Sequence, residues 1–290
     1  MGRVIAILSG KGGVGKTTIT ANLGIALAKR GLNVCVIDAD IAMANLSLLL
    51  NMQNSPITLH DVLLGEANIQ DAIYDAPNNL KFVPSGLSLE NYKRVDSERL
   101  QSIIDSIRNQ FDFIFLDCAA GIEKNVLAAI SASDEVLLIT APSSPSVADV
   151  LKAKITAQRL GSKPIGTILN FVRGEKGEIK KDDVMKILEL PVLVAVPFDD
   201  EVRKSFMQET VMPIMVRKPS SPAAIAIQKA AAKLARISLK VEASPNSGFS
   251  GIIQKILSIF RRKPKTAQEK INSKGVKKWQ IDHSIFWMTL

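Results

Sequence analysis

The feature that most constrains this chain is a glycine-rich loop that joins an apolar run to a run with helical spacing. Val4–Leu8 comes directly before Ser9-Gly-Lys-Gly-Gly-Val-Gly-Lys-Thr-Thr18, and Thr18–Arg30 has the spacing of a helix. The loop matches the pattern G-x-x-x-x-G-K-[ST] in the strand-loop-helix context that this pattern requires. Glycines in such a loop let successive backbone N–H groups turn toward phosphate oxygens. The sequence therefore predicts a nucleotide-phosphate site near the N-terminus.

Two side chains of the loop are predicted to contact the nucleotide phosphates and the metal. Lys16 is expected to contact the β- and γ-phosphates of a bound nucleotide, and Thr17 to ligate Mg²⁺. The dipole of the following helix adds positive potential at the same place. The residues predicted to hold the nucleotide phosphates are Gly10, Lys11, Gly12, Gly13, Val14, Gly15, Lys16, Thr17 and Thr18.

Short apolar runs alternate with helical segments along most of the chain. The runs lack polar alternation, which predicts strands buried on both faces. Repeated strand-helix units predict an α/β fold with a doubly wound, mostly parallel sheet. The expected strands are Val4–Leu8, Asn33–Ile37, Leu80–Pro84, Asp112–Asp117, Glu135–Thr140, Ile165–Leu169 and Val192–Val196. The expected helices are Thr18–Arg30, Asp96–Asn109, Val147–Leu160, Lys180–Leu188 and a last one over residues 219–237.

The chain divides into a nearly neutral body and a basic end. Residues 241–290 carry nine Lys and Arg against three Asp and Glu. A basic end of this kind predicts an anionic partner, either a membrane or a nucleic acid. We expect a folded domain over residues 1–241, a linker over 242–248, an amphipathic helix over 249–263 and a basic tail over 264–290. Trp279 and Trp287 could extend an interfacial contact, or the tail could be disordered.

The segment Phe249 to Arg262 is predicted to be an amphipathic membrane-targeting helix. At 100° per residue its apolar residues fall on one side, its polar residues on the other, and cationic residues gather at its end. A helix packed on the body would show the same stripe, and binding to nucleic acid or in a partner groove is a further alternative. The apolar side consists of Phe249, Ile252, Ile253, Ile256, Leu257, Ile259 and Phe260, and the polar side of Ser250, Gln254, Lys255, Ser258, Arg261 and Arg262.

Cysteine content and apolar run length exclude several classes of protein. Cys35 and Cys118 are the only cysteines, so the chain has no disulfide framework and no CxxC-type zinc or iron–sulfur motif. A reducing compartment is expected. No apolar run approaches the roughly 18–20 residues that cross a bilayer.

The second lysine of the loop, Lys11, makes the motif more specific. The run Lys11-Gly-Gly-Val-Gly-Lys-Thr17 resembles the deviant phosphate-loop family that includes the MinD and ParA ATPases, nitrogenase iron protein and iron–sulfur scaffold ATPases. In that family the extra lysine reaches across an ATP-sandwich dimer to the partner's nucleotide. The resemblance thus implies ATP, Mg²⁺, a homodimer formed with ATP, and a catalytic role for Lys11 beside Lys16.

Three aspartates at predicted strand ends are candidates for the metal and the attacking water. Asp38 and Asp40 follow the second strand, and Asp117 ends the run Phe111–Asp117, at the sheet edge where open α/β sheets bind ligands. Two carboxylates there can hold Mg²⁺-bound waters and orient a water, or merely cap the next segment. By resemblance, Asp40 is the catalytic residue that positions water, and it joins Thr17, Asp38 and Asp117 around the metal. Asp38 is expected to assist the metal from its outer sphere, and Asp117 to reach it through water.

The resemblance also implies which residues sense the γ-phosphate and which contact the base of the nucleotide. Gly121, in Cys118-Ala-Ala-Gly121, is expected to sense the γ-phosphate through its backbone, although Ala119 replaces the usual proline. Asn170 and the segment beginning at Pro197 stand where the family holds adenine; a plain turn at the strand end is the alternative. Both cysteines are interpreted as small apolar residues.

The resemblance covers residues 2–240 for the ATPase body and 249–262 for the anchor. It implies a slow, partner-stimulated ATPase of the MinD type that places the cell-division site. Such a protein is cytoplasmic and peripheral on the inner face of the cell membrane, with an activating or recruited protein partner. The alternatives are a ParA-type DNA-partitioning ATPase, for which nucleic acid would be the partner, and a flagellum or archaellum positioning ATPase. The cysteine count disfavours an iron–sulfur carrier.

Overall fold

The fold is a single eight-stranded sheet with helices on both faces, in a computed structural model that describes residues 1–40, 45–86, 97–207 and 211–237. The strand order is β3-β4-β2-β5-β1-β6-β7-β8, and all neighbours pair in parallel except β3 with β4. The predicted doubly wound, mostly parallel sheet is therefore confirmed. The strands are β1 (Arg3–Leu8), β2 (Val34–Ala39), β3 (Tyr74–Ala76), β4 (Leu80–Val83), β5 (Phe113–Cys118), β6 (Glu135–Thr140), β7 (Lys163–Val172) and β8 (Val192–Pro197).

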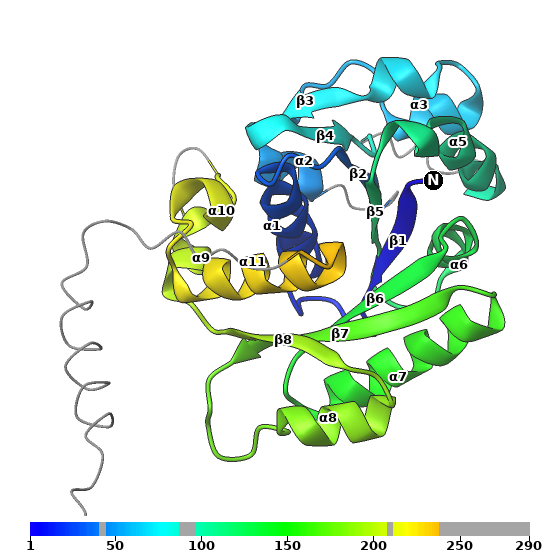
Figure 1. Ribbon diagram of the computed structural model, residues 1–290. Helices are drawn as coiled ribbons and strands as arrows, with labels where there is room; N and C mark the ends of the chain where they lie inside the picture. Colours follow the sequence, from blue (N-terminus) through cyan, green and yellow to red (C-terminus); the bar gives the residue numbers. More distant parts are fainter. Residues whose placement is uncertain (41–44, 87–96, 208–210, 238–290) are drawn as a thin grey trace, which may run out of the picture. The chain divides into compact units, whose positions relative to one another are not determined.

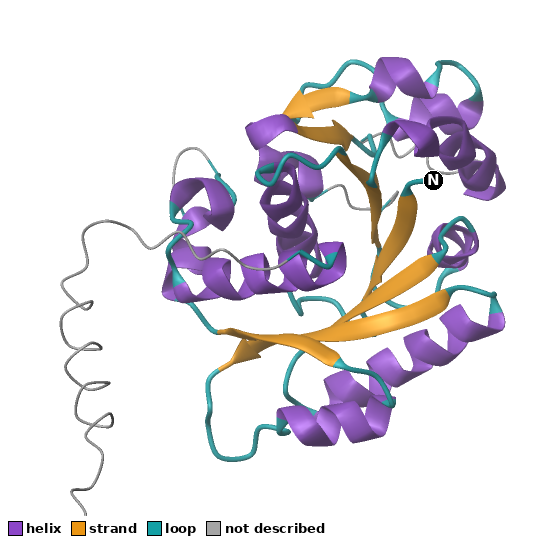
Figure 2. Cartoon of the chain, viewed as in Figure 1, coloured by secondary structure: helices purple, strands orange, loops and turns teal. Residues whose placement is uncertain are grey.

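Two layers of helices enclose the sheet (Figures 1 and 2). One face is covered by α1 (Lys16–Ala28), α2 (Leu46–Leu50), α10 (Ile214–Arg217) and α11 (Pro222–Ala235). The other face is covered by α3 (Leu59–Leu64), α5 (Leu100–Ile107), α6 (Lys124–Ser131), α7 (Ser144–Arg159) and α8 (Lys181–Leu188). The short helix α9 (Asp200–Ser205) follows β8.

Strand β1 shows why the apolar runs do not alternate with polar residues. Val4, Ala6 and Leu8 face the core that contains α5 to α8, whereas Ile5 and Ile7 face the core beneath α1 and α11. Both sets are buried, so every position of the strand must be apolar. At about 25 cal/mol per Å² of apolar surface, burial on both faces is the main stabilising term of this sheet.

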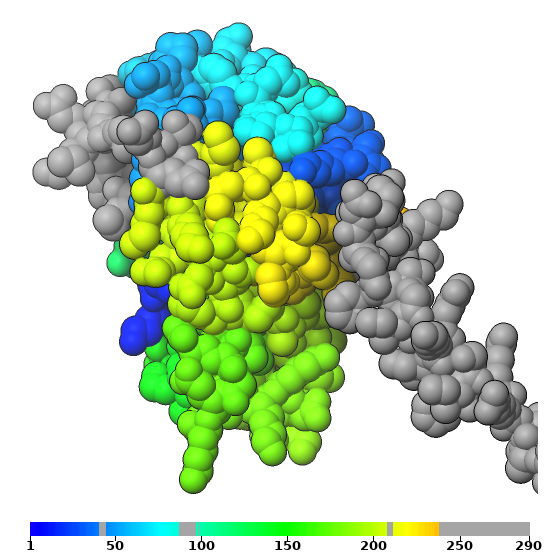
Figure 3. All heavy atoms as spheres, turned by 90° about the vertical axis from the view of Figure 1, so that its left-hand side faces the viewer, coloured from blue at the N-terminus to red at the C-terminus, as the bar shows by residue number. Residues whose placement is uncertain are grey.

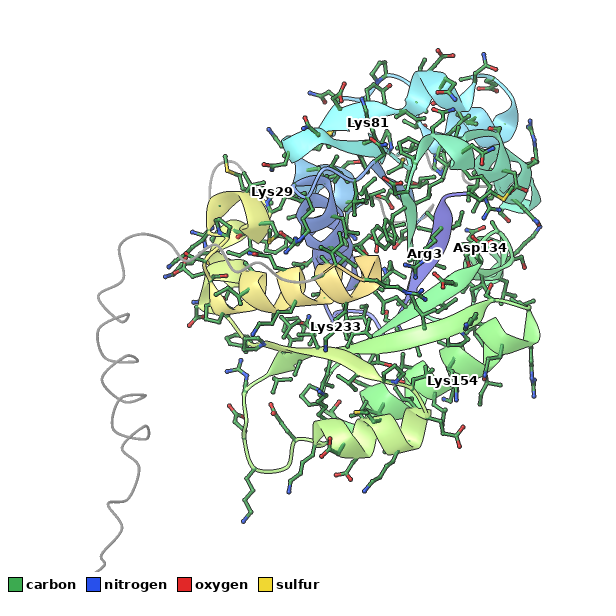
Figure 4. The ribbon with its side chains drawn as sticks, in the orientation of Figure 1. Arg3, Lys29, Lys81, Asp134, Lys154 and Lys233 are labelled. Carbon is green, nitrogen blue, oxygen red and sulfur yellow. The ribbon has the colours of Figure 1, made fainter. Side chains whose placement is uncertain are left out.

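Helices α1 and α11, far apart in the sequence, pack side by side on one face. In Figure 3, blue atoms of the N-terminal part border yellow atoms of the C-terminal part. Ser221 caps α11 by accepting the Ala224 N–H at 3.2 Å, and small alanines along the helix permit a close approach to α1. Three basic side chains, labelled in Figure 4, donate to main-chain carbonyls of other elements: Lys29, at the end of α1, to Met215 of α10 (2.7 Å), Arg3 of β1 to Leu234 of α11 (2.7 Å) and Lys233 of α11 to Leu193 of β8 (2.6 Å).

Several elements differ from their predicted bounds. The first helix begins at Lys16 rather than Thr18, because Gly15 in the left-handed region ends the loop there. The helix predicted over Asp96–Asn109 is α5 with a 3₁₀ turn on each side, Ser97–Arg99 and Arg108–Gln110. Strand β3 and the short helices α2, α3, α6, α9 and α10 were not predicted.

Met1–Leu239 forms one compact unit. The predicted domain boundary at 241, the linker over 242–248, the amphipathic helix over 249–263 and the tail over 264–290 lie outside the described residues. Within the described part of the chain, no helix combines the length and apolarity needed to cross a bilayer.

Candidate functional site

The glycine-rich loop connects β1 to the N-terminus of α1 at the carboxyl end of the sheet. Gly13 and Gly15 have φ values of 79° and 85°, which favour glycine. A Cβ on Gly15 would lie 2.4 Å from Nδ2 of Asn170, so a side chain has no room there. As the N-cap of α1, Gly15 offers no side-chain acceptor. The first N–H groups of α1 are therefore available to an anion.

A cavity of about 650 Å³ lies beside this loop and gathers most of the predicted phosphate residues. Gly10 and Lys11 do not line it: a Cβ on Gly10 would meet the backbone of Asp149 at 2.1 Å, and Lys11 is exposed. The volume is in the range of small-molecule sites. The lining consists of Ser9, Gly12, Gly13, Val14, Gly15, Lys16, Thr17, Thr18, Asp40, Asn45, Leu48, Leu49, Ala119, Ala120, Glu123 and Phe206.

Behind the loop, Lys16 is paired with Asp117, the last-but-one residue of β5. Its Nζ lies 3.4 Å from Oδ1 of Asp117, and both side chains are buried. Burial by itself would lower the pKa of Lys16, but the negative groups nearby, Asp117 first and Asp40 among them, outweigh it and raise that pKa. Lys16 is therefore a cation at neutral pH, placed to meet phosphate oxygens.

Asp38 and Asp117 are register partners on the adjacent parallel strands β2 and β5. Asp38 is fully buried, and its two oxygens accept the N–H groups of Asp40 (3.2 Å) and Leu46 (3.3 Å). Burial, followed by the charges of Asp117 and Asp40, raises the pKa of Asp38 well above its usual range. Asp38 thus holds Asp40 and the first residue of α2 through their N–H groups, which is the capping role considered for this residue.

The donor set fits Mg²⁺. Oδ2 of Asp117 is buried and has no hydrogen-bond partner among the described residues. A buried carboxylate oxygen without a donor is costly unless a ligand or water meets it. No group of three or more His, Cys, Asp or Glu side chains in the described segments could hold a metal by itself. Mg²⁺ suits such a site, because it keeps several waters and takes phosphate oxygens beside few protein groups; Thr17 could supply one of these directly and Asp117 another through a water.

The segment after β5 contacts the loop through its backbone. Gly121 has a φ of 90° and donates its N–H to the carbonyl of Ser9 at 3.2 Å. In this conformation the amide predicted to sense the γ-phosphate is therefore engaged by the glycine-rich loop. Burial raises the pKa of Cys118 to about 12, so this thiol is protonated at neutral pH.

A second, almost entirely apolar cavity of about 240 Å³ adjoins the first, since Thr18 and Phe206 line both. Asn170 and Pro197, which were predicted to contact the adenine base, both line it. Asn170 Nδ2 donates to the carbonyl of Val14 at 2.8 Å. The other lining residues are Ile19, Phe171, Val196, Phe198, Asp199, Val202, Arg203, Ala223 and Ile227.

Three of the residues that line this second cavity are aromatic, Phe171, Phe198 and Phe206. The rings of Phe171 and Phe198 lie 6.4 Å apart, and the guanidinium of Arg173 stacks on the Phe198 ring at 3.5 Å. Phe171 has a φ of 61°, an uncommon value for a bulky residue and one often found at functional sites. Neither Phe171 nor Phe206 was predicted: Phe171 lies in β7 beyond the predicted end of that strand, and Phe206 follows α9, which was not predicted either.

Comparisons with known proteins agree with this geometry. A family model described as an AAA domain, AAA_31, matches residues 2–157, which include the glycine-rich loop and Gly121. An uncharacterized ATP-binding protein of Methanocaldococcus jannaschii is 44% identical over 264 residues, covering 91% of this chain and 98% of that protein. The septum site-determining protein MinD of Thermotoga maritima is 35% identical over 211 residues, covering 70% and 78%. The solved structure of MinD from Pyrococcus horikoshii, complexed with Mg-ADP, has a TM-score of 0.77 at 35% identity, covering 81% and 96%.

Proposed function

Because the chain belongs to the MinD/ParA family of P-loop ATPases, which use ATP and Mg²⁺, we propose that it is a MinD-like spatial regulator of cell division. In this proposal it dimerises with ATP, binds the inner face of the cell membrane through Phe249 to Arg262, and leaves after hydrolysis. The observation that carries the ATPase part is the joined pair of cavities, which places Lys16, Thr17 and Asp40 beside an apolar pocket of suitable size for a base.

The chemistry is transfer of the γ-phosphoryl group from ATP to water. Lys16, with Lys11 of the second copy, balances the negative charge that spreads over the phosphate oxygens in the transition state. Asp40 lies on the cavity wall and orients the attacking water. Bound Mg²⁺ would supply electrostatic stabilisation of the phosphates, and Thr17 and Asp117, assisted by Asp38, are the residues that would hold it. Turnover is slow until a protein partner stimulates it.

Exposed apolar side chains around the cavity mouth support the proposed dimer. Leu48 and Phe206 line the cavity and are each 45% exposed, and Ile122 beside Gly121 is 51% exposed. Large apolar side chains gathered around a ligand site favour a partner surface. A second copy that covers them would also bring Lys11 to the nucleotide.

Dimerisation explains how a weak anchor could act as a switch. A single short amphipathic helix binds a membrane reversibly, and each basic residue near an anionic leaflet adds about 1 kcal/mol. Two helices on one dimer bind with avidity, because the second contact becomes intramolecular. ATP would therefore promote membrane attachment and hydrolysis would reverse it.

A ParA-type DNA-partitioning function is the second candidate, and the basic composition of residues 241–290 favours it. DNA binding through such a segment would fall steeply with salt concentration. A flagellum or archaellum positioning ATPase would share all the chemistry above and differ only in its protein partners.

The decisive experiment is co-sedimentation with anionic vesicles of phosphatidylglycerol and phosphatidylethanolamine, in ATP and in ADP. We expect the full chain to sediment with ATP, and a chain ending at Ser247 to stay in solution. Ile256→Asp on the apolar side should abolish sedimentation, whereas Gln254→Asp, the same added charge on the polar side, should largely keep it. If no form sediments while ATP still drives dimerisation, the helix is not an anchor, and salt-dependent DNA binding becomes the leading function.

A further inference from the structure

Thr20 contacts the metal-site aspartate although no motif includes it. It lies one helical turn after Lys16 in α1 and is fully buried. Its Oγ1 is 2.9 Å from Oδ1 of Asp117 and 2.9 Å from the carbonyl oxygen of Lys16. The hydroxyl has one proton, so the bond to Asp117 competes with the common back-bond to the preceding turn.

The two oxygens of Asp117 are in unequal surroundings. Oδ1 is held by the hydroxyl of Thr20 and, more distantly at 3.4 Å, by the ammonium of Lys16. Oδ2 is buried without a hydrogen-bond partner in the described part of the chain. The donors on Oδ1 therefore fix the rotation of the carboxylate and leave Oδ2 for another ligand.

Lys16 holds Asp117 only weakly in this structure, although its three N–H donors could reach both the carboxylate and phosphate oxygens. Its contact with Oδ1 is long for a charge-assisted bond, and the cavity it lines is the one that would hold phosphates. If a nucleotide draws the ammonium toward its phosphate oxygens, Thr20 is the hydrogen-bond donor to Oδ1 that stays in place among the described residues.

We propose that Thr20 is a positioning residue, whose hydroxyl keeps Asp117 oriented toward the Mg²⁺ position while Lys16 serves the phosphates. The inference rests on the proposed ATPase function. Partners that orient the groups around a metal typically change metal affinity by about 10–100-fold when they are lost. Because Asp117 is expected to reach Mg²⁺ through water, the lower end of this range applies.

The test compares the full chain with Thr20→Val, which keeps the side-chain shape and removes the hydroxyl, and with Thr20→Ser, which keeps the hydroxyl. A fluorescent ATP analogue reports binding, first in EDTA and then over a Mg²⁺ titration. We expect Thr20→Val to raise the Mg²⁺ concentration for half-maximal binding about tenfold. Its affinity in EDTA should stay near that of the unchanged chain, and Thr20→Ser should behave like the unchanged chain.

Two results would overturn the proposal. One is an unchanged Mg²⁺ requirement in Thr20→Val; the other is an equal loss of affinity in EDTA and in Mg²⁺, which would mean that Thr20 only supports the loop. If Thr20→Val does not fold, Thr20→Ala removes the same hydroxyl and is judged by the same criterion. Failure of the ATPase function itself is distinguishable, because the unchanged chain would then bind no ATP analogue under either condition.

Discussion

The side-chain amide of Asn170 donates a hydrogen bond to the carbonyl of Val14 at 2.8 Å and joins the carboxyl half of β7 to the glycine-rich loop. One of the two N–H groups of the amide is thereby engaged by the loop. The side-chain oxygen is then the acceptor that Asn170 can offer to a base in the apolar cavity it lines. Adenine carries an amino donor where guanine carries an oxygen, so this orientation favours adenine.

Replacing Asn170 with alanine should therefore reduce the preference for ATP over GTP. The expected loss of selectivity is about 3- to 10-fold, the value of one net hydrogen bond. Competition of ATP and GTP against a fluorescent analogue measures the ratio. Val196→Ala is the matched control, since Val196 lines the same cavity without a polar group and should weaken both nucleotides alike. If Asn170→Ala leaves the ratio of ATP affinity to GTP affinity unchanged, the Asn170 side-chain oxygen does not select adenine.

The elements that could be predicted from the sequence are those whose pattern is local. The loop between β1 and α1 is specified by its own glycines, and the buried strands by apolar runs that need no knowledge of their neighbours. Strand β3 has three residues, Tyr74–Ala76, at an edge of the sheet and carries no apolar run, so local pattern could not reveal it. The same applies to the shortest helices.

The site was predictable where one segment supplies the chemistry and unpredictable where distant segments meet. Asp40 and the loop residues were placed by motif and resemblance. The contact between Thr20 and Asp117 joins residues 97 positions apart, and Phe206 reaches both cavities from the end of α9. Such contacts depend on how helices pack against the sheet, which periodicity does not determine.

Gly15→Ala should destabilise the nucleotide-free protein, whereas Gly12→Ala should not. Alanine at position 15 would need a φ of 85° and would place its Cβ 2.4 Å from Asn170. We expect a loss of at least about 2 kcal/mol in the free energy of unfolding. Gly12 has no positive φ, and open space surrounds its Cβ position, so its change should stay within about 0.5 kcal/mol. Urea unfolding measures both, and equal losses would contradict the assigned backbone geometry.

Glu201 should make α9 and α10 sensitive to acid. Hydrogen bonds from Lys204 and Arg217 lower the pKa of Glu201 to about 2 from an ordinary 4.5. Because the folded-state value is the lower one, this stabilisation is complete above the unfolded-state pKa and disappears as the pH falls toward 2.

Glu201→Gln tests this directly. The stability difference between the unchanged chain and the variant should shrink as the pH is lowered from 4.5 toward 2, in urea unfolding at a series of pH values. Glu175→Gln is the control, since Glu175 has only a 4.0 Å contact with Arg173 and is largely exposed. A difference that stays constant with pH would show that Glu201 does not titrate with folding.

The two lysines of the glycine-rich loop should separate binding from dimerisation. Lys16 lines the phosphate cavity, whereas Lys11 is exposed and does not. Lys16→Ala should abolish ATP binding by a single chain. Lys11→Ala should keep that binding within about threefold, but lose ATP-dependent dimerisation and slow hydrolysis by on the order of a hundredfold or more, the cost of removing one charge-stabilising group. Nucleotide titration measures ATP binding, light scattering measures dimerisation, and phosphate release measures hydrolysis.

Lys152→Ala is the control. It removes another exposed lysine, on α7, and should leave ATP binding, dimerisation and hydrolysis unchanged. If Lys11→Ala loses ATP binding as completely as Lys16→Ala, Lys11 acts on the nucleotide of its own chain, and the role across the dimer is wrong.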